Sequence, residues 1–342
     1  MAIFAPDVAI DLGTCNTLVY VRGRGIVISE PSIVVISSDD RHMVRAVGNE
    51  ARILMGRTRD NLSAISPIQG GSLDEFGAAQ VLITYFMRKA IGSSFLFRPR
   101  VLVAVPSGLS NIAKRAVMEA VHSAGGKQVI LVEKALAAAI GSGLNAWEAV
   151  GSMVVDIGGG TTDTAVVSMG GIVVSQSIQV GGNRMDEAII NYLKRNSSML
   201  IGNRTAEEVK IDLACAIPIA ENRRVHIRGR DLLSSHAMNV EFTAAQAQEA
   251  MIEPCRNILA SIKWVLERTP PDLSADILHS GIHLTGGASQ LPGLDRMIGV
   301  ETGIPVAVAR APEDCTITGL GYFLENPDLI TQLASSSFAK VV

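Results

Sequence analysis

One short motif occurs twice in this chain, once near its start and once near its middle. The first copy is VAIDLGTCNT at residues 8–17, and the second is VVDIGGGTTDT at residues 154–164. Each copy predicts an apolar strand, an aspartate at its end, a turn of glycine and threonine, and a second strand. A single motif of this kind is typical of an ordinary hairpin, whereas two copies predict a duplicated α/β fold whose halves face each other.

Both turns have the chemistry that a nucleotide polyphosphate requires. Glycine lets a backbone approach a ligand closely, and successive N–H groups in a turn form an anion-binding nest. Hydroxyl and amide side chains in the turns add donors; these are Thr14, Asn16, Thr17, Thr161 and Thr162. Asp11 and Asp156 are too close to phosphates to bind them directly, and they suit a Mg²⁺ ion held through water. Neither turn is a Walker A loop, and no GxGxxG motif follows the first strand, which disfavours a dinucleotide enzyme.

A third glycine segment, GIHLTGGASQLPGL at residues 281–294, predicts a strand, a Gly-Gly step and a helix. Such a junction lets a flat base or a ribose lie against bare backbone. The segment follows both turns in the chain, which fits a nucleotide site assembled from three places.

Composition narrows the fold class and the partners. A chain of 342 residues suggests about two domains. Apolar residues make up 48% but aromatic residues only 4%, which favours an α/β protein with buried aliphatic strands. The net charge of −3 disfavours a nucleic-acid partner. The four cysteines match neither a metal site nor a disulfide framework, so we expect a reduced, cytosolic protein.

The mean hydropathy of +0.30 is high enough to raise the question of a membrane span. The longest uncharged run, residues 164–183, contains two Gly-Gly pairs and predicts two strands rather than a spanning helix. The first seven residues lack a basic region followed by an apolar core, so no export signal is predicted.

Strand and helix signals alternate along the chain. Strands are predicted at residues 8–11, 18–21, 101–105, 128–132, 153–156, 165–167, 172–178, 282–285 and 305–309. Helices are predicted over residues 74–91, 110–125, 135–140, 185–195, 205–214 and 243–268. Pro254 should kink or divide the last of these helices. Residues 215–242 are expected to be irregular, with a solvated hairpin as the simplest interpretation of the basic cluster at Arg223, Arg224, Arg228 and Arg230.

The three glycine segments, in this order, resemble the superfamily of actin, sugar kinases and the seventy-kilodalton heat-shock chaperones. The chain is most similar to the MreB-type bacterial actins, the MreB/Mbl family of rod-shape-determining proteins. The motifs that carry this resemblance are IDLGT at 10–14, EPS at 30–32, VVDIGGGTTD at 154–163, IGNRTAE at 201–207, IRGRD at 227–231, LERTPP at 266–271 and LTGG at 284–287. The resemblance spans roughly residues 7–325.

That resemblance implies an actin-like, ribonuclease H-like α/β fold with two halves around a nucleotide cleft. The first half would cover residues 1–150, with 315–342 returning to it and a small subdomain near 30–75. The second would cover residues 151–314, with a small subdomain near 190–245. Each half would hold a mixed sheet flanked by helices, and ATP with Mg²⁺ would bind between them.

The resemblance also implies roles for particular residues. Asp11 and Asp156 would position Mg²⁺. The phosphates would be held by Thr14, Cys15, Asn16, Thr17, Gly158, Gly159, Gly160 and Thr161. Ribose and adenine would contact Glu207, Glu208, Val209 and Lys210, and the base would be covered by Gly286, Gly287, Ala288, Ser289 and Gln290. Glu207 and Lys210 are three apart on one helical face, so a surface ion pair between them is the alternative.

Several positions depart from the family pattern. Glu133-Lys134-Ala135 stands where Glu-Glu-Pro is usual, and the second Glu would orient or activate the attacking water. Lys134, with an ordinary pKa of about 10.4, should be protonated and unable to accept a proton. We therefore hypothesise slow or absent ATP hydrolysis, with Thr162 and Asp163 as the other residues able to place a water. Asn183 replaces a usual Asp, and Cys15, where Ala is usual, is interpreted as a small filler.

The segment Phe95-Leu96-Phe97 places three bulky apolar side chains between two elements, followed by Arg98 and Arg100. Packing onto the core is one interpretation; the resemblance implies insertion into the inner leaflet of the membrane. It also implies self-assembly into filaments, partners among membrane cell-shape and cell-wall synthesis proteins, and a cytoplasmic, peripherally membrane-associated location. The alternative function is a non-polymerising ATP-dependent enzyme of the sugar-kinase type.

Overall fold

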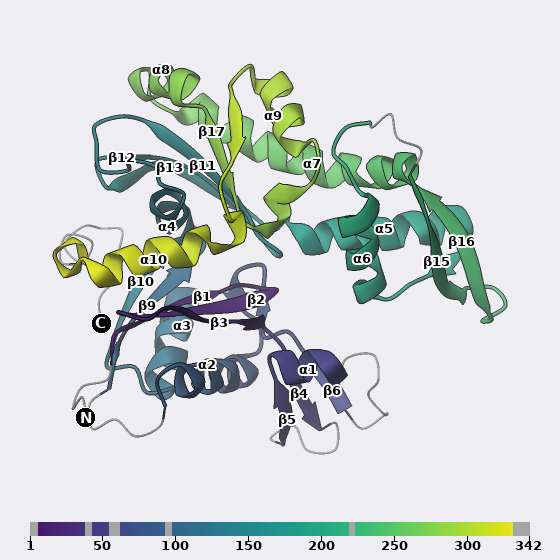
Figure 1. Ribbon diagram of the computed structural model, residues 1–342, viewed down its shortest axis with the longest axis horizontal. Helices are drawn as coiled ribbons and strands as arrows, with labels where there is room; N and C mark the ends of the chain where they lie inside the picture. The colour runs from purple at the N-terminus through teal and green to yellow at the C-terminus, as the bar shows by residue number, and fades with distance from the viewer. Residues whose placement is uncertain (1–5, 38–42, 55–61, 93–97, 219–222, 331–342) are drawn as a thin grey trace.

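The computed structural model describes residues 6–37, 43–54, 62–92, 98–218 and 223–330. Figure 1 shows two large halves, one above the other, each with a smaller extension on the same side. The two large halves have one five-stranded sheet each.

The two sheets have the same topology. In the first, the order is β10 (Gln128–Glu133), β9 (Arg100–Val105), β1 (Val8–Leu12), β2 (Asn16–Val21) and β3 (Gly25–Pro31). In the second, the order is β18 (Val306–Val308), β17 (Ile282–Thr285), β11 (Ser152–Ile157), β12 (Thr162–Ser168) and β13 (Gly171–Ile178). In each sheet the first strand in the chain pairs antiparallel with the next one and parallel with a strand that follows later. The duplication predicted from the repeated motif is therefore present in the strand order.

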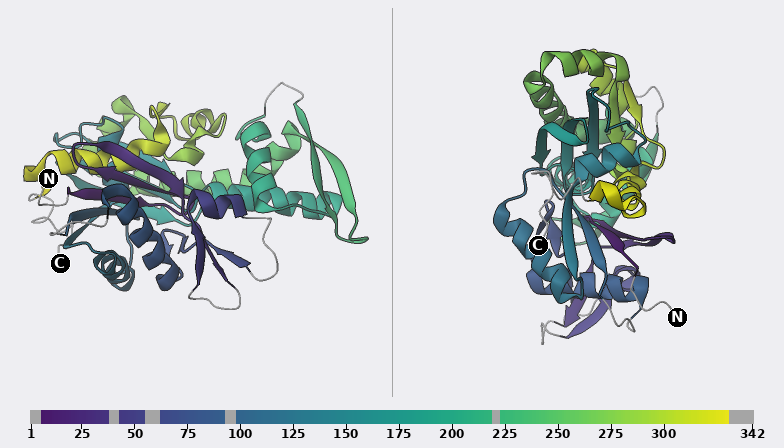
Figure 2. Two further views of the ribbon diagram at one scale, coloured as in Figure 1. Left: turned by 60° about the horizontal axis from the view of Figure 1, so that its bottom comes forward. Right: turned by 90° about the vertical axis from the view of Figure 1, so that its left-hand side faces the viewer.

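Helices cover the outer faces of both sheets and fill the space between them. The outer helices are α2 (Phe76–Ile91) and α3 (Asn111–Ser123) on the first half, and α7 (Ala244–Arg268), α8 (Pro271–Ser280) and α9 (Leu294–Thr302) on the second. Helix α5 (Gly182–Ser197) runs from the second half into its smaller extension. The views in Figures 1 and 2 agree that α4 (Lys134–Gly141) and α10 (Cys315–Glu325) lie between the two sheets. A cluster of buried apolar side chains joins these two helices to both sheets, which holds the halves together.

Each half carries a small subdomain. The first consists of α1 (Asn49–Leu54) and a sheet of β4 (Val34–Ser37), β5 (Val44–Val47) and β6 (Leu62–Ile65). The second consists of α6 (Asn203–Leu213) and a sheet of β14 (Met199–Leu200), β15 (Arg224–Asp231) and β16 (Ala237–Thr243). The two-stranded β7 (Ile68–Gln69) and β8 (Ser72–Leu73) and the short helices η1 (Gly287–Gln290) and η2 (Pro312–Asp314) complete the elements. The domain boundaries given above stay a prediction; residue 150 lies between the strands of the two large sheets.

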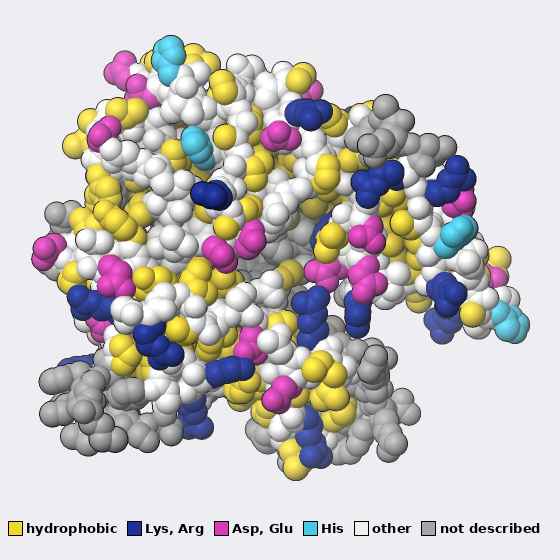
Figure 3. All heavy atoms as spheres, in the orientation of Figure 1, with side chains coloured by type: hydrophobic (Ala, Val, Ile, Leu, Met, Phe, Trp, Pro, Cys, Tyr) yellow, Lys and Arg dark blue, Asp and Glu magenta, His cyan; other side chains and the backbone are white. Residues whose placement is uncertain are grey.

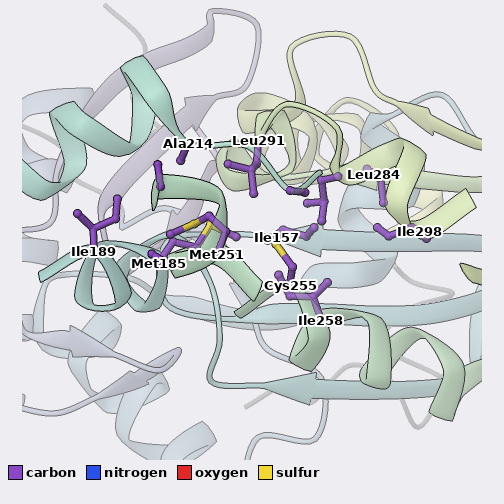
Figure 4. Close-up of a cluster of buried hydrophobic side chains, with 14 of the residues drawn as sticks. Ile157, Met185, Ile189, Ala214, Met251, Cys255, Ile258, Leu284, Leu291 and Ile298 are labelled. Atoms are coloured by element: carbon purple, nitrogen blue, oxygen red, sulfur yellow. The ribbon is translucent and has the colours of Figure 1, made fainter. Parts of the chain in front are cut away.

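The prediction that residues 215–242 are irregular was wrong in part, because β15 and β16 form an antiparallel hairpin over 224–243, as the interpretation of the basic cluster indicated. Pro254 was expected to kink or divide its helix. It does not divide the helix, since α7 is one element of 25 residues, and a kink stays a prediction. Buried residues before and after Pro254, among them Met251, Cys255 and Ile258, keep one face of α7 in the core of the second half (Figure 4). That burial outweighs the hydrogen bond that proline removes.

The second core also positions the start of α5. Figure 4 shows Met185 and Ile189 of α5 pointing into the same cluster as Met251 of α7 and Ile157 of β11. Because Ile157 immediately precedes the second glycine turn, this packing fixes the first residues of α5 beside that turn.

Helices α4 and α10 approach each other with no side chain between their backbones. A methyl group on Gly319 would overlap the carbonyl oxygen of Ala137, and one on Gly141 would overlap that of Cys315. Glycine at both positions is therefore required for the contact that joins the two halves.

Gly319→Ala should lower the free energy of unfolding by about 3 kcal/mol, because a backbone carbonyl cannot move aside as a side chain can. Gly77→Ala is the matched control: Gly77 is exposed in α2, and a methyl there meets nothing within 4 Å. The control should be neutral or stabilising by at most about 1 kcal/mol, since alanine favours helix. Urea denaturation measures both, and equal stability of the two variants would contradict the close contact.

Candidate functional site

The two copies of the repeated motif meet where the halves face each other. A side chain at Gly159 would overlap the Sγ atom of Cys15, and one at Gly160 would overlap the Oγ1 atom of Thr14. The bare backbone of the second turn thus lies directly against the side chains of the first. The structure brings together the two turns that the repeat predicted would face each other.

Hydrogen bonds within each half fix the shape of its turn. The Ser32 hydroxyl donates to the carbonyl oxygen of Gly13 at 2.6 Å and lies 2.8 Å from the Thr17 hydroxyl. In the second turn the Gly158 N–H donates to the Thr161 carbonyl at 2.9 Å, and the Thr162 hydroxyl donates to the Val180 carbonyl at 2.7 Å. The side chains of Thr17 and Thr162 are wholly buried. Both hydroxyls are therefore engaged within the fold, and their use as ligand donors stays a prediction.

The start of α5 closes the second turn from one side. The N–H groups of Gly182 and Asn183 donate to the carbonyls of Gly158 and Gly159 at 3.0 and 2.8 Å. The Cys15 thiol donates to Oδ1 of Asn183 at 3.0 Å, so this asparagine links the two turns. Burial, with nearby Glu207, raises the pKa of Cys15 to about 11, which keeps the thiol protonated and supports its interpretation as a filler. The sequence marked Asn183 only as a departure from a pattern, and its linking role depends on a contact 168 residues away.

Lys134, the first residue of α4, pairs with the aspartate of the first turn. Its Nζ atom lies 2.8 Å from Oδ1 of Asp11, and both side chains are only 10% exposed. Burial disfavours the ammonium, but the charges of Asp11, Asp156 and Asp163 outweigh it, so the pKa of Lys134 lies above its ordinary value. The lysine is therefore positively charged at neutral pH, as its ordinary pKa indicated.

The aspartates of the second half are buried around the same lysine. Oδ1 of Asp156 accepts a hydrogen bond from the Thr285 hydroxyl at 2.9 Å. Burial raises the pKa of Asp156 to about 7 although Lys134 opposes it. Asp163 is fully buried and accepts bonds from the Ser107 N–H and the Thr161 hydroxyl, each at 3.0 Å. Because Ser107 belongs to the first half, Asp163 also ties the halves together.

Asp11 and Asp156 do not offer an open pair of ligands for Mg²⁺. Asp11 is already paired with an ammonium, and one oxygen of Asp156 is engaged by Thr285. A metal ion prefers oxygen ligands and would have to lie beside the positive charge of Lys134. In the part of the chain that the structure describes, no group of three or more His, Cys, Asp or Glu residues is arranged to hold a metal. These residues do not fit the predicted ion.

The four residues predicted on α6 divide into two sets. Lys210 lies 2.8 Å from Oδ1 of Asp186 and donates to the Gly182 carbonyl at 3.2 Å, and Glu207 lies 3.8 Å from Arg52 of α1. Glu207 and Lys210 thus do not form the alternative surface pair. Val209 is buried in the core and Glu208 pairs with Arg204 on the surface, so neither side chain shares that face. Asp186 and Arg52 were not predicted, since only the packing of α5 and α1 against α6 brings them here.

Figure 3 shows this side of the molecule indented between the arm that carries α5 and α6 and the block that carries α1, with acidic and basic side chains gathered at the rims. The Arg52–Glu207 pair joins the two small subdomains across this gap.

The third glycine segment lies beside the second turn. Gly286 has a φ of 80°, and a methyl group there would overlap the carbonyl of Ile157. The Ser289 hydroxyl is buried and donates to the Gly286 carbonyl at 2.7 Å, whereas the exposed Gln290 donates to Glu313 at 3.2 Å. A methyl on Gly182 would come within 3.7 Å of Ala288, which places this segment next to the start of α5.

The predicted membrane-contacting segment, Phe95, Leu96 and Phe97, lies outside the described residues. Of the two arginines that follow this segment, Arg98 is exposed, whereas Arg100 pairs with Asp7 at 2.6 Å. Glu133, the last residue of β10, is partly buried, and that burial raises its pKa.

Within the described ranges, no helix combines the length and apolar character needed to cross a membrane.

Comparison with known proteins settles the family. The family model for the MreB/Mbl protein matches residues 5–332. The chain belongs to the MreB/Mbl family. It is 43% identical to the cell shape-determining protein Mbl of Bacillus subtilis (strain 168), over 95% of this chain and 98% of that protein. It is 44% identical to the cell shape-determining protein MreB of Escherichia coli (strain K12), over 96% and 95% of the two chains.

Solved structures agree with this MreB/Mbl assignment. The crystal structure of MreB 5 of Spiroplasma citri bound to AMPPNP superposes with a TM-score of 0.90 at 30% identity and covers 96% of this chain and 98% of its own. The same protein bound to ADP gives the same score and identity over 97% and 99%. The MamK double helical filament, at 21% identity and a TM-score of 0.77, shares the fold. The predicted actin-like fold is confirmed.

Proposed function

We propose that this chain is an ATP-binding bacterial actin homologue that polymerises into membrane-associated filaments, which organise cell-wall synthesis and rod cell shape. The observation that carries the proposal is the close approach of Gly159 and Gly160 to Cys15 and Thr14, which would let the two turns act together as one phosphate-binding site. Mbl and MreB relatives that are named as cell shape-determining support the cellular role.

ATP would contact all three glycine segments. The N–H groups of the two turns would hold the phosphates, because adjacent turn amides form anion nests. Thr14, which is half-buried, and Asn16, which is exposed, would add side-chain donors. Lys210 and Glu207 would contact the ribose and adenine, and residues 286–290 would cover the base. The nucleotide-bound structures of MreB 5 support this assignment. Mg²⁺ stays a prediction and has no part in the proposal, since Asp11 is already paired.

Hydrolysis would be slow because of Lys134. A protonated lysine only donates hydrogen bonds, so it cannot accept a proton from an attacking water. Thr162 and Asp163 are wholly buried, and their side chains are already engaged by Val180 and by Ser107 and Thr161. Glu133 is therefore the remaining candidate for placing a water, and residue 134 supplies no base. ATP would therefore stay bound in the site for a long time before it is hydrolysed.

Filament formation would bring the chain into contact with copies of itself, and membrane association would place it on the inner face of the cytoplasmic membrane. Its further partners would be membrane cell-shape and cell-wall synthesis proteins. Phe95, Leu96 and Phe97 are the proposed membrane contact, since each buried apolar side chain is worth about 1.5–3 kcal/mol and many copies in a filament bind together.

Sedimentation with nucleotide tests the filament proposal. The protein should pellet with ATP or AMPPNP and stay in the supernatant without nucleotide. Gly159→Ala should stay in the supernatant even with ATP or AMPPNP, because the new methyl overlaps Cys15 and separates the turns that would bind the nucleotide. Gly77→Ala, remote from the site, should pellet as the wild type does. A chain that binds ATP but pellets under no condition would favour the non-polymerising enzyme of the sugar-kinase type.

Phosphate release tests the role of Lys134 in hydrolysis. Lys134→Glu should raise the steady-state rate by about 100-fold, the lower end of what a positioned general base contributes. Lys127→Glu, which makes the same charge change at an exposed position, should leave the rate unchanged. Equal, brisk release by the wild type and Lys134→Glu would refute the proposal.

Liposome pelleting tests the membrane contact. Phe95→Ser combined with Phe97→Ser should abolish pelleting with anionic vesicles while ATP affinity stays the same. The matched control is Leu233→Ser with Val300→Ser, which removes two apolar side chains that are 87% and 85% exposed elsewhere. If both double variants pellet like the wild type, residues 95–97 are not the contact.

A further inference from the structure

The position of Lys134 is unfavourable for a helix. It is the first residue of α4, whose other residues are apolar, and the positive end of the helix dipole disfavours a cation there. Among the Lys and Arg side chains of the described ranges, it alone is buried, at 8% exposure. Something other than helix stability must hold this charge in place.

What holds it are the carboxylates at the ends of the two repeated strands. Asp11 lies 2.8 Å away on the first half, and the charges of Asp156 and Asp163 act on it from the second. Asp11 is two residues before Gly13, and Asp156 is two residues before Gly158. The ammonium therefore lies at the junction of the halves, at the base of both turns.

Lys210 and Arg52 also lie near the turns, and like Lys134 they are paired with carboxylates, but they are less buried. Lys210 is paired with the partly buried Asp186 at 2.8 Å, and Arg52 is exposed and paired with Glu207. The turns themselves offer N–H groups but no full charge. A polyphosphate in this site would need compensation for several negative charges, and Lys134 is the buried side chain placed to supply it.

We propose that the ammonium of Lys134 takes the electrostatic part that a divalent cation would play in this site, so that ATP binds without Mg²⁺. The inference rests on the proposed nucleotide-binding function. It follows from the finding that Asp11 and Asp156 do not fit a Mg²⁺ ion. These carboxylates, which would position the ion, instead surround the ammonium of Lys134. No step of hydrolysis is assigned to the lysine, which acts on binding.

Equilibrium binding with and without metal tests the proposal. The affinity of the full-length, nucleotide-stripped protein for ATP and for AMPPNP is measured by calorimetry in excess Mg²⁺ and again in excess EDTA. For the wild type the two dissociation constants should differ by less than about fivefold, the lower limit of typical coupling between two ligands. A larger loss of affinity in EDTA overturns the proposal, and this arm needs no variant.

Lys134→Glu provides the second arm, because it lowers the formal charge at residue 134 by two units, the charge of a Mg²⁺ ion. This variant should bind ATP at least about tenfold more weakly in EDTA than in Mg²⁺. Lys127→Glu, with the same charge change on the surface, should behave as the wild type does. Metal-independent binding by Lys134→Glu overturns the assignment to this residue; should that variant not fold, Lys134→Met replaces it, with the same expected direction.

The outcomes separate the two proposals. If the wild type binds neither ATP nor AMPPNP in either buffer, the proposed nucleotide-binding function fails. If it binds tightly in Mg²⁺ and loses that affinity in EDTA, the proposed function stands and the role of Lys134 fails.

Discussion

The structure depends on the close approach of its two halves at positions where the chain has no side chain. Gly159 and Gly160 bring the second turn against the first, and Gly141 and Gly319 bring α4 against α10 between the sheets. Both contacts join elements far apart in the sequence. Because protein interiors are close-packed, a single methyl group at such a contact must displace backbone. The geometry of the candidate site and the stability of the interface between halves therefore have the same physical origin.

Charge at this junction is arranged around Lys134. Three aspartates from two halves are buried within reach of one ammonium, and burial of carboxylates without a cation would be costly. The same group offsets part of the negative charge of these aspartates, two of which lie just before the glycine turns. A lysine at this position thus links the folding of the interface to the charge that a nucleotide would meet. It also explains why Asp11 is a poor metal ligand here although the strand that carries it is the expected one.

Much of the fold was predictable because it follows from local pattern. The repeated strand–aspartate–turn motif predicted two equivalent halves, and apolar runs predicted the buried strands β1, β9, β10, β11 and β17 close to their observed bounds. Tertiary packing outweighs a local signal in two places. Pro254 does not divide α7, because residues before and after it are buried in the core. Val209 lies between Glu207 and Lys210 in the sequence, but helical periodicity turns its side chain into the core.

The sequence by itself determined which residues could carry the chemistry: the paired glycine turns, their aspartates, and a lysine where the family resemblance implies a water-activating carboxylate. It did so because glycine, aspartate and lysine have properties that do not depend on the fold. Only the tertiary structure decided how these groups are used. Thr17 and Thr162 are spent on internal hydrogen bonds, Asn183 links the turns, and Lys134 pairs with Asp11. Each of these partners is distant in sequence or set by the packing of whole elements, and no local pattern specifies a contact between two halves of a chain.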